Sequence, residues 1–397
     1  MRSLALVSLA AGTWLAFLPP PLHAEQDFGT CLAGLRAEAV ARGVSAATFD
    51  SQTRGLAPDM TVLDLQQQQP EFRIPIWDYL AALVDDQRIA DGRAMLAQWR
   101  STLDAVEARF GVDRHVVVAV WGVESDFGRS VGKHPLVQSL ATLACYGQRA
   151  SYFRGELMAT LRIIEAGDVN PAHLYGSWAG AFGHTQFMPS TFLRLAVSME
   201  GDGRRDVVDS VPDALGSTAN YLRKAGWVAG GGWGFEVAVP EGFRGASGRK
   251  IKRPFSAWAA AGIRRADGRP LPRVGVAGLM MPAGRQGPAF LVTRNFDAIF
   301  SYNAAESYAL AISLLADRLR GGGPLIGAWP TNDRGLSRAE RKEVQTLLTR
   351  RGYDVGNPDG AVGAKTHAAI VNYEAKVGLP QTGLPGGLVL DALRAGR

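Results

Sequence analysis

The segment VVVAVWGVESDFG, Val116 to Gly128, joins a long apolar run to a single glutamate. Every residue from Val116 to Val123 is apolar or glycine, which predicts a segment that is buried on all sides. Glu124 follows directly. Because an ionised carboxylate is costly to bury, such a group finds a partner or becomes neutral. Glu124 is therefore either a structural group that caps or salt-bridges a helix end, or a carboxylic acid with a raised pKa and a chemical role.

The chain of 397 residues is long enough for one large and one small domain, and its composition, with 47% hydrophobic and 20% charged residues, is that of a globular protein. Residues 1–24 differ from the rest: Arg2 precedes an apolar stretch that ends in three prolines and Ala24. This pattern is typical of a secretory signal peptide cleaved after Ala24. The stretch is too short and interrupted for a good membrane span. We expect an exported, soluble mature protein without a membrane anchor.

The formal net charge of +6 fits either attraction to a polyanion or an ordinary solvated surface, and we favour the second interpretation. No block of lysines interleaved with aromatic residues suggests nucleic acid as a partner. Cys31 and Cys145 are the two cysteines of the chain. In an oxidising compartment such a pair can close one disulfide. The alternative is two separate buried thiols, and we favour the disulfide.

Hydrophobic periodicity predicts a mainly helical body from about residue 28 to 319. The region 228–294 is rich in Gly and Pro and contains short alternating segments, so strands and loops are expected there. A Gly-Gly-Gly-Pro run at 321–324 begins a linker. The helices expected from the pattern cover residues 31–41, 92–110, 152–166, 190–197, 213–225 and 304–319.

The C-terminal part has a different character. Ser337-Arg338-Ala339-Glu340 has the S-x-x-E form of a capping box, which predicts the start of a helix. A second helix is expected over 365–376, and the unit is small enough to bury only a modest core, which suits a binding module. We therefore divide the chain into a signal peptide (1–24), a catalytic domain (25–323), a linker (324–335) and a small binding domain (336–397).

Several common kinds of site are not indicated. The six histidines form no HExxH pair, Ser177 lies in GSWAG rather than in a G-x-S-x-G elbow, and GGGWGF at 230–235 lacks a preceding strand and is interpreted as a turn. Two other segments contain residue types that suit a saccharide. GSWAGAFGHTQFMPSTF (176–192) carries Ser177 and Gln186, which can bond sugar hydroxyl or acetamido groups, and FSYNAAESYALAI carries Tyr302 and Asn303, interpreted as preceding a helix.

At these segments a family resemblance emerges. GVESDFGRSVGKHPL, GSWAGAFGHTQFMPSTF, GDGRRD, ANYLRKAGW and SYNAAESYALAI, in this order and spacing, resemble the soluble lytic murein transglycosylase B family over about residues 28–320. LSRAERKEVQTLLTRRGY and NPDGAVGAKTHAAIVNYEAKVGL, with a final short helix, resemble a peptidoglycan-binding domain of the three-helix type. The resemblance implies a mainly α fold: a lysozyme-like catalytic domain with a small strand-containing insertion beside the groove, followed by a small three-helix domain.

The resemblance also implies roles for particular residues. The family's catalytic acid falls on Glu124. The residues that would contact the saccharide are Arg149, Ser177, Gln186, Tyr221, Tyr302 and Asn303. Some members bind calcium in a loop that would fall on 198–209, where the weak ligand candidates are Ser198, Glu200, Asp202, Arg204 and Asp209. Because Ser198 stands at the first ligand position in place of aspartate, and Arg204 and Arg205 add positive charge, we expect no tight calcium site and no required cofactor.

The expected function is that of an exported lytic transglycosylase that acts in the periplasm on peptidoglycan glycan strands, with other cell-wall enzymes as conceivable partners. It would cleave between N-acetylmuramic acid and N-acetylglucosamine, with Glu124 as acid and then base, and leave 1,6-anhydromuramoyl ends. Asp126, the nearest second carboxylate, should point away from Glu124 unless the helix has already ended. Two alternatives stay open, a hydrolytic muramidase and a non-catalytic wall-binding protein. The C-terminal domain is expected to act as an anchor, so its removal should leave turnover of short glycans largely intact.

Overall fold

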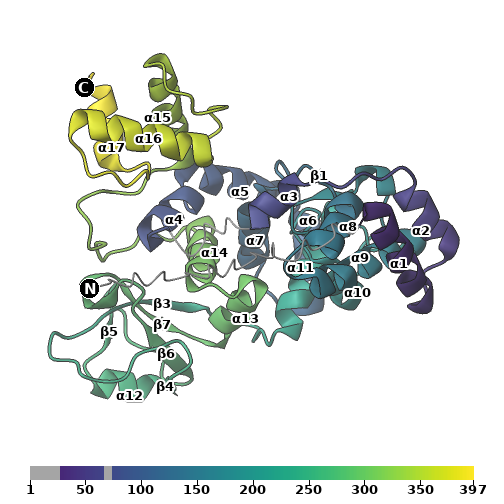
Figure 1. The fold of residues 1–397 in the computed structure, drawn as a ribbon. Coiled ribbons are helices and arrows are strands. Elements are labelled where there is room, and N and C mark those ends of the chain that lie inside the picture. Colours follow the sequence, from purple (N-terminus) through teal and green to yellow (C-terminus); the bar gives the residue numbers. More distant parts are fainter. Residues whose placement is uncertain (1–26, 67–73) are drawn as a thin grey trace, which may run out of the picture.

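The computed structural model describes residues 27–66 and 74–397, and the predicted signal peptide at 1–24 lies outside these residues. The fold is mainly α, as expected, with a five-stranded sheet, a two-stranded ribbon and a separate C-terminal helical unit (Figure 1). Within the described residues, no helix has both the length and the apolarity needed to cross a membrane.

One half of the catalytic body is built from two separate stretches of its sequence, residues 28–66 and 134–195. Its hydrophobic core is formed by side chains such as Leu35, Leu140, Phe153 and Phe192. Cys31 and Cys145 are joined by a disulfide, which ties the first helix to α8. The elements are α1 (Phe28–Ala41), α2 (Ala46–Thr53), α3 (Thr61–Gln66), α8 (Leu136–Tyr146), α9 (Ala150–Glu165) and α10 (Pro189–Leu195), with a two-stranded ribbon of β1 (His134–Pro135) and β2 (Tyr175–Gly176).

The other half surrounds the apolar segment with which the sequence analysis began. That segment forms the helix α7 (Arg114–Ser125), in which Val116 to Trp121 are all at most 2% exposed. A second apolar helix, α14 (Glu306–Leu319), packs against it. The remaining helices are α4 (Ile76–Leu83), α5 (Asp86–Gln98), α6 (Arg100–Phe110), α11 (Val211–Lys224) and α13 (Arg294–Asn303). Tyr221 and Tyr302 pack on the cores of both halves.

The region expected to contain strands forms a five-stranded antiparallel sheet in the order β4-β6-β7-β3-β5. Its strands are β3 (Gly234–Ala238), β4 (Lys252–Pro254), β5 (Arg264–Arg265), β6 (Val276–Met280) and β7 (Ala289–Val292), with the short helix α12 (Phe255–Ala260) beside them. The sheet lies at the end of the molecule opposite α1 and α2 (Figure 1).

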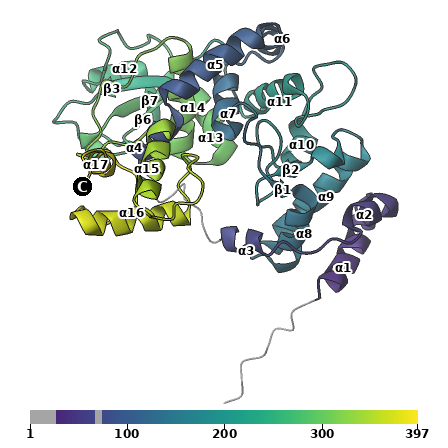
Figure 2. The same ribbon diagram turned by 90° about the horizontal axis from the view of Figure 1, so that it is seen from above.

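The C-terminal unit consists of α15 (Arg338–Arg350), α16 (Ala364–Val377) and α17 (Gly387–Arg394) around a small core of its own. The predicted capping box is present: the Ser337 hydroxyl accepts from the Glu340 backbone N–H, and the Glu340 carboxylate accepts from that of Ser337. In the view from above, α15 stands beside α4 (Figure 2). The unit is therefore docked on the catalytic body.

The structure differs from the expected local structure at three places. Residues 92–110 are not one helix, because α5 ends at Gln98 and α6 begins at Arg100. Tyr302 and Asn303 do precede the helix α14, as expected, but they also end another helix, α13, which was not expected, and Ala304 follows in the left-handed conformation with φ 51°. GGGWGF is only partly a turn, because Gly234 and Phe235 begin β3. The end of α13 lacked its usual signal, since glycine or asparagine rather than alanine commonly occupies a left-handed helix end.

Candidate active site

The end of α7 is an unusual backbone turn. Asp126, Phe127 and Gly128 follow the helix with φ values of 51°, 59° and 84°. Positive φ is uncommon for residues other than glycine and carries strain that the surroundings must offset. Here the Asp126 N–H donates to the Gly122 carbonyl and the Phe127 N–H to the Trp121 carbonyl. The turn ends α7 directly after Glu124 and Ser125.

A neighbouring segment holds this turn in place. The Ser125 hydroxyl donates to the His184 carbonyl at 2.5 Å and accepts from the Gly128 N–H at 2.8 Å. The Trp121 indole N–H donates to Nδ1 of His184 at 3.2 Å. Because His184 lies within the motif GHTQF, these bonds bring the motif at 183–187 against the end of α7. Two segments that the sequence singled out are thus brought together.

Glu124 lies beside the start of α14. The Tyr308 hydroxyl donates a hydrogen bond to Oε1 of Glu124, and Tyr308 is 2% exposed. Burial among apolar helices raises the pKa of Glu124 to about 7, although the bond from Tyr308 by itself lowers it. The Glu124 side chain is nevertheless partly exposed. It is therefore a desolvated carboxyl group that holds its proton near neutral pH and can be reached from outside.

An aromatic cluster extends from Tyr308. The ring of Tyr302 stacks on Tyr308 with centroids 6.3 Å apart, and Tyr221 lies 4.7 Å from Tyr302. The two hydroxyl groups are fixed by backbone carbonyls: that of Tyr302 donates to Thr185 at 2.7 Å and that of Tyr221 to Ser301 at 2.6 Å. Of the residues predicted to bind saccharide, Tyr221 and Tyr302 thus belong to one wall that leads to the carboxyl group.

The side chains of Gln186 and Ser177 form hydrogen bonds with the backbone of nearby loops. Gln186 has φ 52°, and its amide NH₂ donates to the carbonyls of Val131 at 3.0 Å and Gly183 at 2.8 Å. Within the described residues its side-chain oxygen has no partner, and it can accept from a ligand. The Ser177 hydroxyl accepts from the Ala181 N–H at 3.1 Å and closes the GSWAG turn.

Arg149 and Asn303 are more peripheral. Arg149 precedes α9, and its guanidinium lies 4.3 Å above the ring of Tyr152. Asn303 is the last residue of α13 and is exposed. Within the described residues, neither side chain is hydrogen-bonded to the protein. The structure brings neither of them into contact with the carboxyl group of Glu124.

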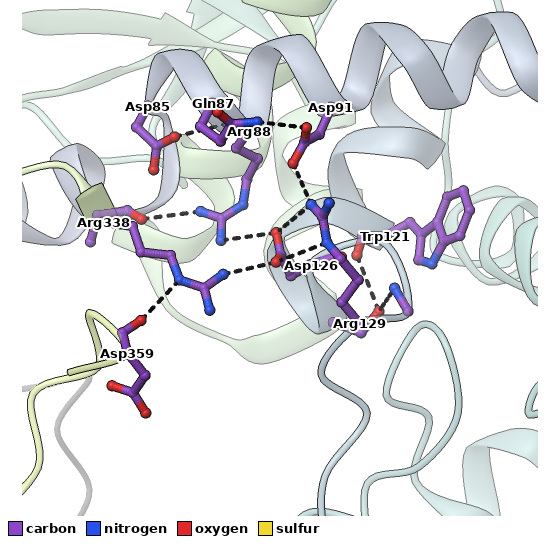
Figure 3. Close-up of polar contacts among 12 residues, drawn as sticks. Asp85, Gln87, Arg88, Asp91, Trp121, Asp126, Arg129, Arg338 and Asp359 are labelled. Carbon is purple, nitrogen blue, oxygen red and sulfur yellow. Dashed lines mark hydrogen bonds and ion pairs between the residues drawn. The ribbon is translucent and has the colours of Figure 1, made fainter. Parts of the chain in front are cut away.

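The acidic residue nearest in sequence to Glu124 is Asp126, and its carboxylate is paired with arginines. The helix has ended at Asp126, so the geometric objection to this residue as a catalytic partner does not apply. Its carboxylate is instead surrounded by three guanidinium groups, those of Arg129, Arg88 and Arg338 (Figure 3). Hydrogen bonds and charge from these arginines hold its pKa below the usual value, although burial opposes them. Asp126 is an ionised structural group rather than a second catalytic acid.

In the loop at 198–209, which holds the weak calcium candidates, most polar side chains are paired with neighbouring groups of the protein. Nδ1 of His173 lies 2.8 Å from Oδ2 of Asp209, and the Arg204 guanidinium pairs with the carboxylate of Asp206 at 2.8 Å. Asp202 accepts from the Ser198 hydroxyl and the Arg204 N–H, and the charge of Glu200 acts on Asp213. The buried Asp213 closes the base of the loop by accepting from the backbone N–H groups of Met199 and Asp206. In the described part of the chain, no three acidic, cysteine or histidine side chains converge on a metal position.

Sequence reasoning missed Tyr308, Ser125 and His184. Each lies in a motif that was recognised, but none was given a role. A signal was available for Tyr308, because it is a phenol within the otherwise apolar helix ESYALAISLLA, and a buried hydroxyl requires a partner. The roles of Ser125 and His184 depend on long-range contacts that no local pattern reveals.

Comparisons with known proteins match both parts of the chain. The model of the transglycosylase SLT domain family matches residues 27–317, and that of a putative peptidoglycan-binding domain matches 337–393. The chain is 34% identical over 279 residues to the membrane-bound lytic murein transglycosylase B of Escherichia coli, a match that covers 66% of this chain and 74% of the relative.

Solved structures extend the likeness to nearly the whole chain. SltB3 of Pseudomonas aeruginosa, crystallised with NAG-anhNAM-pentapeptide, is 45% identical with a TM-score of 0.76, covering 93% of this chain and all of that one. An Escherichia coli lytic transglycosylase bound to bulgecin A is 28% identical with a TM-score of 0.65, covering 76% of this chain and 98% of that one. The chain described here belongs to the SLT transglycosylase family and is an enzyme of the lytic transglycosylase class, with a C-terminal domain of the peptidoglycan-binding type.

Proposed function

We propose that this enzyme cleaves peptidoglycan between N-acetylmuramic acid and N-acetylglucosamine, with Glu124 as its single catalytic acid and base. The observation that carries the proposal is the placement of Glu124: a partly exposed carboxyl group at the end of a buried helix, with a pKa of about 7 and no second free carboxylate in the turn. A group with such a pKa can both donate and accept a proton near neutral pH.

In the first step Glu124 protonates the glycosidic oxygen, and the bond from that oxygen to C1 of the muramic acid breaks. Tyr308 donates to Oε1 of Glu124, which leaves Oε2 as the oxygen that carries the proton. The positive charge that develops at C1 is met by the acetamido oxygen of the same sugar, because Asp126 is occupied by three arginines. N-acetylglucosamine leaves with the proton.

In the second step the carboxylate of Glu124 removes the proton from the C6 hydroxyl of the muramic acid. The C6 oxygen forms a new bond to C1, which yields a 1,6-anhydro ring. Glu124 is protonated again by the proton from the C6 hydroxyl, and no water is consumed. The relative whose complex contains NAG-anhNAM-pentapeptide supports this product. A hydrolytic muramidase would instead need water at C1 and would leave a reducing end.

We propose that the aromatic wall and the two loops bind the sugars. Tyr302 and Tyr221 present ring surface and fixed hydroxyl groups, Gln186 presents its carbonyl oxygen, and Ser177 supports the turn beside β2. Arg149 and Asn303 would contact sugars farther from the cleaved bond. The chemistry requires no cofactor, and the donor set at 198–209 does not support a calcium site.

The setting of the reaction follows from the substrate. We propose that residues 1–24 direct export and are removed, that the enzyme acts in the periplasm, and that residues 25–323, 324–335 and 336–397 are catalytic domain, linker and wall-binding domain. The domain of the peptidoglycan-binding type supports this arrangement, because a second module raises the local concentration of a polymer. Other cell-wall enzymes are compatible partners.

The test uses purified protein and isolated sacculi, with the soluble products identified by mass. We expect 1,6-anhydromuramoyl ends from the wild type and a rate about 10²–10⁴-fold lower from Glu124→Gln, which keeps the shape but cannot donate the proton. Reducing ends that incorporate oxygen from labelled water would identify a hydrolase. No release of soluble glycan by any preparation would support the non-catalytic alternative.

A further inference from the structure

We propose that the C-terminal domain, through Arg338, holds in place the turn Asp126–Gly128 that follows Glu124, which we call the catalytic turn. This domain would then support the active site in addition to binding the wall. The proposal rests on the assignment of Glu124 as the acid. Its central observation is that Arg338, the first residue of α15, reaches the turn that follows Glu124 and pairs with Asp126 (Figure 3). Arg338 is thus a positioning residue that belongs to another domain.

The contact of Arg338 is the closest of the three at Asp126. Its Nη1 lies 2.8 Å from Oδ2 of Asp126, while the shortest distance is 3.2 Å for Arg129 and 3.7 Å for Arg88. The Asp126 side chain is 15% exposed and that of Arg338 is 46% exposed, so the pair is shielded from solvent on the aspartate side. Asp126 also has a positive φ. A residue in that conformation keeps its place because its surroundings hold it there.

Arg88 cannot take over this task. It is 7% exposed, its Nη1 donates to the Ala82 carbonyl, and its Nε has no hydrogen-bond partner. Arg129 donates to both carboxylate oxygens of Asp126 at 3.2 Å and to its backbone carbonyl at 3.0 Å, but it also pairs with Asp91, so its guanidinium is shared between two carboxylates. Loss of Arg338 would therefore remove the closest of the three guanidinium groups and leave Asp126 with the two more distant ones.

Arg338 itself is held by its own domain. Ser337 and Glu340 form the capping box that starts α15 and places Arg338 at its first position, and Arg334 pairs with Glu340 at 2.8 Å. The Nε of Arg338 donates to the Asp359 carbonyl at 3.4 Å. The guanidinium therefore follows the position of the domain as a whole.

The linker fixes that position. The Glu236 carboxylate, on β3, accepts from the backbone N–H groups of Ile326 and Gly327 at 2.8 and 2.6 Å. The Trp329 ring lies 6.3 Å from that of Trp77 on α4. At Gly335 the backbone passes so close to α4 that a Cβ there would lie 2.8 Å from the Trp77 carbonyl oxygen. The segment expected to be a simple linker is a packed connection.

The contact between Arg338 and Asp126 is ionic, and it can be removed without disturbing an apolar core. A cavity of about 390 Å³ lies between the two domains and is lined almost entirely by charged side chains, among them Arg88, Asp126, Arg338 and Lys342. A contact made by charges around a cavity, and not by a packed apolar core, can be removed by one substitution without exposing a hydrophobic surface. This makes the role of Arg338 testable in the full-length enzyme.

The experiment measures kcat and KM on a short soluble glycan, which does not need the domain as an anchor. We expect Arg338→Ala to lower kcat about 3- to 10-fold with KM changed less than about twofold, because a displaced catalytic group acts on the chemical step. Arg338→Lys should recover most of the loss. The control is Arg394→Ala, which removes the surface ion pair with Glu343 in the same domain and should equal the wild type.

A second variant tests the pathway. Asp126→Asn removes the charge that Arg338 meets, and asparagine tolerates the left-handed conformation. We expect the double variant Asp126→Asn with Arg338→Ala to be no slower than Asp126→Asn alone. Equal kcat for Arg338→Ala and Arg394→Ala would overturn the proposal while leaving Glu124 as the acid. Activity of Glu124→Gln near that of the wild type would instead overturn the proposed function on which it rests. If Arg338→Ala fails to fold, the comparison of Arg338→Lys with Arg338→Gln decides the same question.

Discussion

Glu124 has opposite effects on chemistry and on stability. Its pKa of about 7 in the folded protein lies above the ordinary value of 4.5, so between these two pH values the folded state binds a proton that the unfolded state does not. The stability of the fold therefore decreases as pH rises from about 4.5 to 7 and stays lower above that range. A shift of this size corresponds to roughly 3 kcal/mol.

Glu124→Gln should remove that cost. We expect the variant to have a higher free energy of unfolding than the wild type at pH 8, by up to about 3 kcal/mol, and a smaller advantage near pH 4.5. Urea titrations of both proteins at the two pH values measure the difference. The idea fails if the glutamine variant is the less stable protein at pH 8.

Tyr308 should affect the pH dependence of the rate. Its hydroxyl donates to Glu124 and so lowers the pKa of that carboxyl group against the effect of burial. Tyr308→Phe keeps the ring that stacks on Tyr302, but we expect the alkaline limb of the kcat profile to move to higher pH. The maximal rate should fall about 10-fold, as for the loss of one hydrogen bond. An unchanged pH profile would show that the hydroxyl does not act on the acid.

At the level of elements, strong periodic signals predicted the helices well. The apolar run before Glu124 predicted the buried α7, and the S-x-x-E pattern predicted the start of α15. The break between α5 and α6 at Trp99 has no glycine or proline to announce it. Propensity and periodicity describe neighbours along the chain, whereas such a break is imposed by packing between helices.

For the candidate site, the sequence likewise predicted the residues that lie in distinctive motifs but not the distant residues that hold them. Sequence motifs pointed to Glu124, Tyr302 and Gln186, because each lies in a segment whose pattern is distinctive. The partners that fix them are remote: Tyr308 and Glu124 are 184 residues apart, and Arg338 and Asp126 are 212 residues apart. No local pattern can specify a pair so distant. The ionic docking of the C-terminal domain was for this reason not anticipated.

The disulfide should matter most to the half of the body that contains α1. It joins residues 114 apart in sequence, and closing a loop of this length stabilises by about 4–5 kcal/mol in the chain-entropy model, often less in practice. Reduction, or the Cys31→Ser and Cys145→Ser double variant, should lower the Tm. Thermal unfolding of oxidised and reduced protein measures this, and labelling of unfolded, unreduced periplasmic material should find no free thiol.

On the scale of the whole molecule, the C-terminal domain has two roles that can be separated. Deleting residues 336–397 keeps the packed linker and should weaken co-sedimentation with sacculi about 10²-fold, because the second binding module is lost. Contrary to the expectation from the sequence alone, it should also lower kcat on short glycans, because Arg338 is lost. Full-length Glu124→Gln is the control and should sediment like the wild type. If the deletion variant sediments equally well, the domain is not an anchor.

The hydrogen bonds from residues 326 and 327 to the Glu236 carboxylate should also affect proteolysis of the linker. Two arginines are potential trypsin sites here: Arg320 precedes the linker and Arg334 lies near its end. Arg320 is paired with Asp113 and Asp317, and Arg334 is paired with Glu340. A protease needs an extended, accessible strand, which this segment offers only after the grip of Glu236 opens. The rate at which trypsin separates the two domains therefore reports how often the C-terminal domain leaves its dock. Glu236→Gln should make the chain easier to cut there.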